Sequence, residues 1–288
     1  MKLKSYLRLL RPSHYIKNFF VLSPLFFSLK FAEFKLLERS IFAFIVFSLI
    51  ASSVYILNDI KDIDEDKEHP EKSKRPIVNG EISISSAIKV LIALACIGFT
   101  LAYLVTIKLL FIMLIYYVLN IFYNFGLKHI AIADVFIVSS GFVLRVFAGA
   151  ESINVPVTMW IVLITFLLSL FLALSKRRDN IILAGEGNKI RKNIDGYNLV
   201  FVNSGMIIMS AVVIVCYILY TISDDVIKRF NTDKLYFTVL FVLLGILRYM
   251  QIIFVENNSA DPIKIFLKDK LLQLIIISWL AVFLLIVY

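Results

Sequence analysis

Long runs of hydrophobic residues fill most of the chain, and short polar segments separate them. A helix needs about 20 mostly apolar residues to cross a bilayer core of about 30 Å. The runs are continuous rather than alternating, which favours membrane helices over a membrane barrel, since backbone polar groups in lipid must bond within the protein. We therefore predict nine spans, at residues 16–32, 39–57, 84–106, 109–126, 130–150, 157–175, 199–222, 235–255 and 271–288.

The first of these runs has the weakest pattern. Lys17, Asn18 and Pro24 interrupt it. Proline removes a backbone donor and bends a helix, so we expect a kink here. Lys17 and Asn18 either face a polar site or, for the lysine, extend toward the membrane surface.

Composition supports a membrane protein. The chain is 60% hydrophobic and 18% charged, whereas soluble domains are nearer half apolar and a quarter charged. We expect an all-α integral membrane protein with one transmembrane domain over residues 1–288. The net charge of +9 is better explained by basic cytoplasmic loops than by nucleic acid binding, so we expect no nucleic acid partner.

The distribution of basic residues predicts an orientation. If the N-terminus is cytoplasmic, twenty of the thirty Lys and Arg residues lie in cytoplasmic segments and seven in outer ones. This bias favours a cytoplasmic N-terminus, an outer C-terminus and a cell-membrane location. The longest polar stretches, 58–83 and 176–198, then lie on the cytoplasmic side, where we expect the functional site.

An acidic motif follows the second predicted span. Asn58, Asp59, Asp62 and Asp66 share one face if the helix continues, because they are three or four residues apart. Neighbouring carboxylates repel unless a cation lies among them, and Mg²⁺ is held by carboxylates together with substrate phosphates. We predict that these four residues are metal ligands and that the three aspartates are catalytic. The alternative is a solvated loop of mixed charge.

Basic residues follow the acidic motif. Lys74 and Arg75 are suited to phosphate oxygens, and Pro76 and Gly80 indicate a turn. An acidic cluster, a basic cluster and a turn at the end of an apolar helix predict a magnesium-diphosphate site.

The motif Asn58-Asp59-x-x-Asp62-x-x-x-Asp66, with Lys74-Arg75-Pro76 after it, resembles the first Asp-rich signature of the UbiA superfamily of intramembrane prenyltransferases. The resemblance implies a bundle of nine transmembrane helices with a central cavity open to the cytoplasm. The count of nine spans agrees with it independently.

The usual second Asp-rich motif of that superfamily is missing. The corresponding loop reads Ser175-Lys176-Arg177-Arg178-Asp179-Asn180, and Asp195 comes much later. Basic residues there bind a phosphate without a metal, or they only reflect cytoplasmic charge bias. Other segments are similar to the decaprenyl-phosphate phosphoribosyltransferase branch: 11–18, 123–129 with Asp134, 145–149, Lys176-Arg177, and Arg248-Tyr249 with Pro262 and Asp269.

That branch resemblance implies an activity: transfer of phosphoribose from phosphoribosyl pyrophosphate to a polyprenyl phosphate in the membrane, with Mg²⁺ as the cofactor. The aspartates would hold the diphosphate. The predicted substrate-binding residues are Lys17, Asn18, Asn58, Lys74, Arg75, Tyr123, Lys128, Arg145, Lys176 and Arg177.

Arg145 lies well inside the fifth predicted span. A charge there costs at least about 2.5–3.5 kcal/mol on insertion scales, so a partner is expected. The partner is either a phosphate or carboxylate in the cavity, or an ion pair with a residue such as Asp134.

Two other functions compete with this one. A prenyltransferase acting on an aromatic or other small acceptor is the nearer alternative, although the missing second Asp-rich motif counts against it. A transporter or lipid flippase is the other, but the sequence has no repeat at a fixed spacing. Polyprenyl length and oligomeric state are not predicted.

Overall fold

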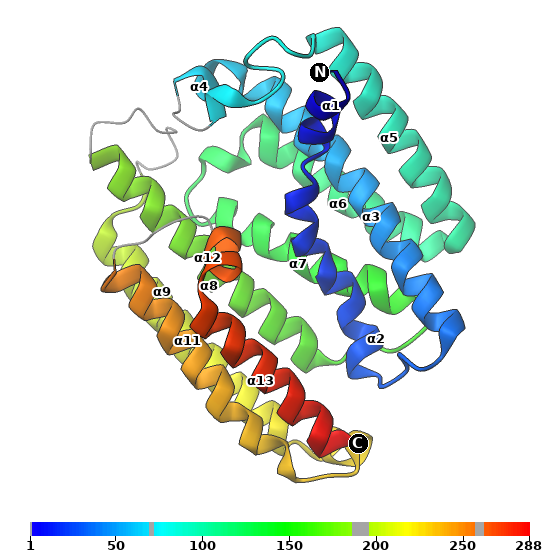
Figure 1. Cartoon of the computed structure of the whole chain (residues 1–288), viewed down its shortest axis with the longest axis vertical. Coiled ribbons are helices and arrows are strands. Elements are labelled where there is room, and N and C mark those ends of the chain that lie inside the picture. Colours follow the sequence, from blue (N-terminus) through cyan, green and yellow to red (C-terminus); the bar gives the residue numbers. More distant parts are fainter. Residues whose placement is uncertain (1, 69–71, 186–195, 257–261) are drawn as a thin grey trace. The chain divides into compact units, whose positions relative to one another are not determined.

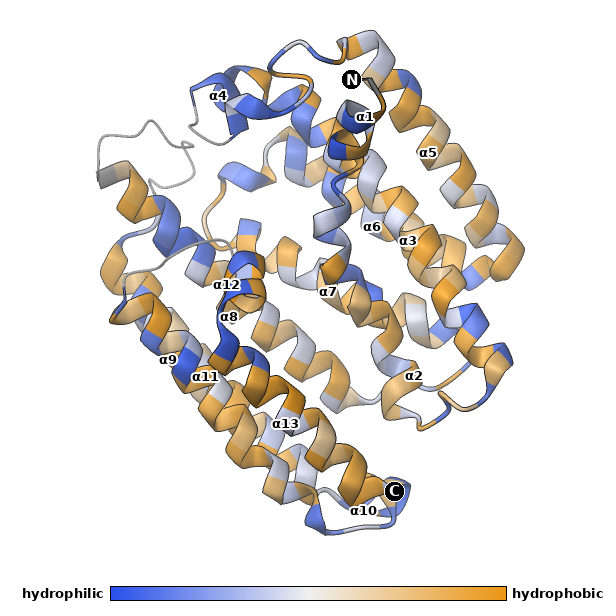
Figure 2. Ribbon diagram, in the orientation of Figure 1, coloured by the Kyte–Doolittle hydropathy of each residue, from blue (hydrophilic) through white to orange (hydrophobic). Residues whose placement is uncertain are grey.

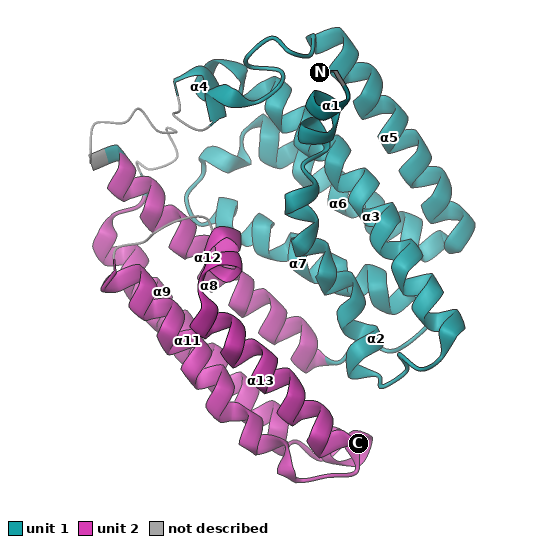
Figure 3. Cartoon of the chain, viewed as in Figure 1, with its two compact units in different colours: residues 1–158, 184–196 teal, residues 159–183, 197–288 magenta. Residues whose placement is uncertain are grey.

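The computed structural model describes residues 2–68, 72–185, 196–256 and 262–288. Helices make up almost all of these residues (Figure 1). The helices form two compact units (Figure 3). Unit 1 contains residues 1–158 and 184–196, and unit 2 contains residues 159–183 and 197–288.

Unit 1 is built around one long helix, α3, which packs against α5, α6, α7 and the 3₁₀ helix η1. Phe47 and Ile50 of α3 are fully buried in its core. Gly98 of α5 lies directly against Ile50, which allows the two helices to approach closely. The elements of unit 1 are α1 (Lys2–Leu10), η1 (Pro12–Leu22), α2 (Ser23–Phe27), α3 (Phe34–Lys61), α4 (Ile63–Lys67), η2 (Lys72–Lys74), α5 (Ile84–Val105), α6 (Ile107–Phe125), η3 (Leu127–His129) and α7 (Ala133–Ser152).

Unit 2 is a helix bundle with several polar side-chain bonds between its helices. The Tyr217 hydroxyl lies 2.8 Å from the Thr238 hydroxyl and accepts a 2.8 Å hydrogen bond from the Trp279 ring nitrogen. Such bonds hold apolar helices together in lipid. Its elements are α8 (Met159–Gly185), α9 (Leu199–Ile222), α10 (Asp224–Phe230), η5 (Lys234–Thr238), α11 (Val239–Phe254), α12 (Pro262–Lys268) and α13 (Lys270–Val287).

Within the described residues, eight helices are long and apolar enough to cross a membrane. They correspond to all the predicted spans except the first. Figure 2 shows hydrophobic residues along these helices and hydrophilic residues gathered at α4. The protein is thus a multi-pass α-helical membrane protein.

The first predicted span, 16–32, is not one continuous α-helix. Residues 12–22 form a 3₁₀ helix and residues 23–27 a short α-helix. A 3₁₀ helix rises about 2.0 Å per residue, so the two pieces together cover about 30 Å. This segment is therefore long enough to cross a bilayer, but the predicted count of nine helices is not confirmed.

The segment after the sixth predicted span is helical rather than a loop. The sequence indicated a loop from residue 175, whereas α8 continues to Gly185 and carries Lys176, Arg177 and Arg178 on its last turns. The charges there mark where the apolar part stops, but Lys and Arg are good helix formers and do not end the helix.

Candidate functional site

The acidic motif lies where α3 ends. Asp59 is on the last turn of α3, and Asp62 joins α3 to α4, with φ −96° and ψ 11°. The helical bonding pattern crosses this joint, because the Asp62 amide donates to the Asn58 carbonyl at 2.9 Å and the Asp66 amide to the Asp62 carbonyl at 2.8 Å. The predicted helical spacing therefore persists, and it brings the three aspartates together.

Two arginines from distant segments bind Asp59 and Asp66. Each of the two carboxylate side chains is about 1% exposed. Arg11 forms an ion pair with Asp59, and Arg75 forms one with Asp66. Arg75 also lies 3.0 Å from the same Asp59 oxygen that Arg11 contacts. The Arg75 guanidinium therefore bridges the two carboxylates.

The third carboxylate has a different cation. Lys128 of η3 forms an ion pair with Asp62, and both side chains are almost fully buried. The Asn58 amide nitrogen donates to the other Asp62 oxygen at 3.1 Å. A lone buried charge is costly, and each of the three aspartates has an opposite charge beside it. We call Asp59, Asp62, Asp66, Arg11, Arg75 and Lys128 the charged cluster.

Helix α1 helps to position the basic side of the charged cluster. Arg8 donates a 2.6 Å hydrogen bond to the Lys74 carbonyl, next to Arg75. Leu9 is fully buried in a small apolar cluster with Ile77 and Ile82. The segment 72–82 is thus attached to the N-terminal helix. Arg11, which follows that helix, has a left-handed backbone with φ 54°.

Burial changes the acidity of Asp66. Loss of water contact raises the pKa of its carboxyl above the usual value, although the nearby Arg75 and Lys72 charges act in the opposite direction. A carboxylate that is costly to keep charged is stabilised when a further cation approaches it.

Two predicted site residues, Asn18 and Arg145, form a separate group in unit 1. Arg145 Nε donates to Asn18 Oδ1 at 2.9 Å and its Nη1 donates to the Gly141 carbonyl at 2.7 Å. Its guanidinium also lies over the Phe47 ring, 4.6 Å from the centroid. Asp134 is not its partner, and no carboxylate pairs with Arg145 among the described residues.

The predicted basic residues of unit 2 lie at the end of α8. Lys176 is exposed, whereas Arg177 and Arg178 are each 7% exposed. Arg178 Nε donates to Asn203 Oδ1 at 3.1 Å, and its guanidinium lies 5.2 Å from the Phe254 ring centroid. Its Nη1 is buried without a hydrogen-bond partner in the part of the chain that the structure describes. Asp195 lies outside the described residues.

The other predicted residues lie at three places in unit 1. Lys17 is half-buried on η1, Lys74 is exposed, and Tyr123 is half-buried near the end of α6. Our candidate set missed Arg11 and Arg178. Arg11 has a sequence signal, since it precedes Pro12 in one of the family-like segments, but its contact with residue 59 depends on the fold.

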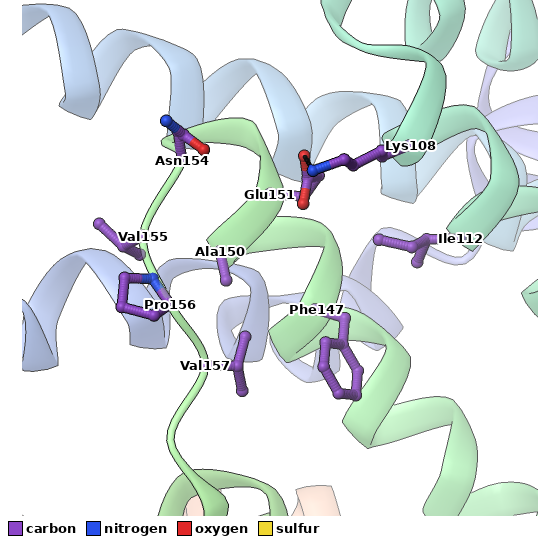
Figure 4. A pocket seen from close by; sticks show the side chains of 9 residues that line it. All are labelled: Lys108, Ile112, Phe147, Ala150, Glu151, Asn154, Val155, Pro156 and Val157. Atoms are coloured by element: carbon purple, nitrogen blue, oxygen red, sulfur yellow. Dashed lines mark ion pairs between the residues drawn. The ribbon is translucent and has the colours of Figure 1, made fainter.

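A pocket of about 490 Å³ in unit 1 lies elsewhere (Figure 4). Lys108 and Glu151 form its ion pair, at 3.4 Å. They stand at the start of α6 and the end of α7, about 28 Å along α6 from the end that carries the charged cluster. The pocket has no group of carboxylates, so it does not suit a diphosphate.

Comparison with known proteins identifies the family. The UbiA prenyltransferase family matches residues 21–182. The chain belongs to this family. The decaprenyl-phosphate phosphoribosyltransferase of Mycobacterium tuberculosis (strain H37Rv) is 32% identical over 94% of this chain and 90% of its own length. The protein of that name from Corynebacterium glutamicum is 31% identical over 98% of this chain and 86% of its own.

The UbiA fold is also found in solved structures. A UbiA homolog from Archaeoglobus fulgidus bound to DMAPP and Mg²⁺ has a TM-score of 0.72 and 18% identity, covering 98% of this chain and 99% of that one. This likeness confirms the fold that the acidic motif predicted.

Proposed function

We propose that the protein transfers 5-phosphoribose from phosphoribosyl pyrophosphate to a polyprenyl phosphate and releases diphosphate. The charged cluster carries this proposal, because three buried carboxylates and three cations meet at the end of one membrane helix. The relatives named decaprenyl-phosphate phosphoribosyltransferase, similar along nearly the whole chain, supply the substrate class.

The residues of the cluster fit Mg²⁺ with a diphosphate. No three His, Cys, Asp or Glu side chains are grouped as a complete metal cage within the described segments. Mg²⁺ does not need one, since it usually takes one or two carboxylates and completes its shell with water and substrate phosphate. Asn58, Asp59, Asp62 and Asp66 would hold the ion. When bound, it neutralises charge on the departing diphosphate.

The cations of the cluster then have a second role. Arg11, Arg75 and Lys128 now neutralise the aspartates. With metal present, the same donors would turn toward diphosphate oxygens, which Arg binds in a bidentate manner. These ion pairs balance the charge of the three aspartates within the cluster.

The acceptor requires little acid–base help. The phosphate of a polyprenyl phosphate is already an anion, so it attacks C1 of the ribose without a general base. The protein supplies positioning and electrostatic stabilisation. Attack on the face opposite the leaving diphosphate predicts inversion at C1.

Further phosphate contacts are proposed for the basic and polar residues outside the cluster: Lys17, Asn18, Lys74, Tyr123, Arg145, Lys176 and Arg177.

The membrane placement is part of the proposal. The basic bias of alternate loops supports a cytoplasmic N-terminus in the cell membrane. The charged cluster would then face the cytoplasm, where a soluble phosphoribosyl donor is available, and the lipid acceptor would enter from the bilayer.

The test is a transfer assay with purified protein in detergent, Mg²⁺, polyprenyl phosphate and radiolabelled phosphoribosyl pyrophosphate. We expect label in the lipid extract, abolished by a chelator and reduced at least 100-fold by Asp62→Ala. Asp64→Ala is the matched control, because Asp64 is on α4 but its side chain is 94% exposed. Asp62→Asn provides a second variant that keeps the side-chain shape.

A different substrate would overturn the proposal. If folded protein transferred no phosphoribose but consumed a prenyl diphosphate with a small acceptor, the chain would be a prenyltransferase, as other family members are. The same Asp62 variants would then report on prenyl transfer.

A further inference from the structure

Asn124, on the last turn of α6, has an acceptor atom without a partner. The side chain is 4% exposed. Its amide nitrogen donates to the Asn120 carbonyl at 2.9 Å. Its Oδ1 is buried, with no hydrogen-bond partner among the described residues. Buried polar atoms in folded proteins nearly always have a partner, so this oxygen requires an explanation.

The orientation of this amide is determined by its neighbour. A carbonyl oxygen only accepts hydrogen bonds, so the group that faces the Asn120 carbonyl must be the NH₂. Rotating the amide by 180° would set two acceptors against each other. The atom that lacks a partner is therefore the oxygen, and its missing partner is a donor.

The position of Asn124 is close to the charged cluster. On the next residue, the Phe125 ring lies 4.2 Å from the Lys61 ammonium, which joins the end of α6 to the end of α3. Four residues after Asn124, Lys128 pairs with Asp62. Asn124 is on the inward face of α6, since it follows the buried Tyr116 by two turns.

The chemistry of a nearby substrate indicates which of its groups could donate a hydrogen bond to Asn124 Oδ1. Phosphate oxygens are acceptors and would not bond to an amide oxygen. A diphosphate held by the aspartates carries C1 of the sugar next to it, and the ribose hydroxyls at C2 and C3 are the neighbouring donors. A prenyl diphosphate has no hydroxyl group at all.

We propose that Asn124 Oδ1 accepts a hydrogen bond from one ribose hydroxyl of the phosphoribosyl donor. This inference rests on the proposed function and adds a residue that selects a sugar diphosphate over a prenyl diphosphate. A site built to bond a substrate hydroxyl discriminates strongly against an analogue that lacks it, because the protein group is then left unpaired.

The test compares phosphoribosyl pyrophosphate with its 2-deoxy and 3-deoxy analogues, using the full chain, Mg²⁺ and polyprenyl phosphate. We expect wild-type protein to favour the parent donor over one analogue on the order of tenfold or more in kcat/KM. In Asn124→Leu this ratio should fall to about one, since no acceptor remains, while KM for the lipid stays the same.

The ratio separates specificity from folding. Both donors are measured on the same preparation, so a partly misfolded Asn124→Leu sample lowers both rates and leaves the ratio intact. Asn120→Leu, one turn earlier on the same face, is the matched control and should keep the wild-type ratio. Asn124→Ala gives a second variant with a smaller side chain.

Three outcomes decide the matter. The inference is supported if Asn124→Leu and Asn124→Ala lose the preference for the parent donor over one deoxy analogue while the Asn120→Leu control keeps it. An unchanged ratio in both variants, with wild-type transfer intact, overturns the role of Asn124 and leaves the proposed function standing. Absence of any phosphoribosyl transfer by wild-type protein overturns both.

Discussion

The two units carry their buried charges in different ways. In unit 1, Asp59, Asp62 and Asp66 each have a cation in contact, so the cluster is nearly neutral. In unit 2, Arg178 is buried, donates a hydrogen bond to Asn203 and lies over the Phe254 ring, and the Asp179 charge is nearby. A balanced cluster can exchange its internal partners for a metal and an anion, whereas a buried cation whose direct hydrogen-bond partner is neutral can bind an anion without a metal.

The two units also differ in how closely their helices approach each other at glycine residues. In unit 1, Gly149 of α7 lies so close to η1 that a Cβ would overlap the Val21 carbonyl. In unit 2, a Cβ on Gly245 of α11 would make an ordinary contact of 3.7 Å with Ile275. Unit 1 thus depends on a close backbone approach where α7 meets η1, whereas unit 2 tolerates added side-chain volume at Gly245.

The largest predicted effect would sharpen this contrast in packing. We expect Gly149→Ala to destabilise the protein by about 3 kcal/mol or more, because backbone atoms of η1 cannot move aside as a flexible side chain would. Gly245→Ala should be neutral or stabilising by up to about 1 kcal/mol, since alanine favours helix. Thermal unfolding in detergent measures both.

Equal melting temperatures for the two glycine variants would contradict the close approach of η1 and α7. A lowered melting temperature for Gly245→Ala would instead show that unit 2 is packed as tightly as unit 1.

Sequence predicted the long helices well, because length and continuous apolar character are sufficient to identify a span. The 199–222 span agrees with α9 at both ends. The failures are at polar residues. The 3₁₀ form of residues 12–22 was not predicted, and α8 continues beyond its apolar part. Helix type and helix end there depend on packing and capping rather than on hydropathy.

For the site, the sequence predicted which aspartates share one helix face, but it did not predict which cations pair with them. Spacing alone placed Asp59, Asp62 and Asp66 together, since helical periodicity is local. The pairing of Arg11 with Asp59 joins residues 48 positions apart, and that of Lys128 with Asp62 joins residues 66 apart. Such contacts follow from how helices pack, which no local pattern contains.

The next prediction tests the contrast between the paired charges of unit 1 and the buried Arg178 of unit 2. If Arg178 binds a substrate phosphate, Arg178→Gln should raise KM for that substrate about tenfold or more. The reason is that a hydrogen bond to a charged group contributes about 1.5–3 kcal/mol. Steady-state kinetics with each substrate varied in turn would show which phosphate is affected.

The matched control for this substitution is Arg229→Gln, which removes the same charge from an exposed position in unit 2. It should leave both KM values unchanged. Unchanged KM values in Arg178→Gln would mean that its neutral partners suffice and that the units do not differ in this respect.

The smallest predicted effect concerns an ion pair of unit 2 between Arg248 and Asp269, where Arg248 also pairs with Glu256. Arg248 donates to Asp269 at 2.6 Å, and this bond holds the pKa of the Asp269 carboxyl below its usual value. A lowered pKa in the folded state means that the pair stabilises the protein above about pH 4, and that this contribution is lost as the pH falls through the folded-state pKa. Asp269 also caps α13 through the Leu272 amide.

Asp269→Asn should keep the cap and lose the ion pair, because asparagine accepts the same backbone bond. The pair is partly exposed, so we expect a loss of about 0.5–1 kcal/mol and a melting temperature lower by roughly 1–3 °C at pH 7. The difference between wild type and variant should shrink as the pH falls below about 4, and it should vanish once the wild-type carboxylate is protonated in the folded state. A difference that persists at low pH would show that Asp269 acts through its cap and not through its charge.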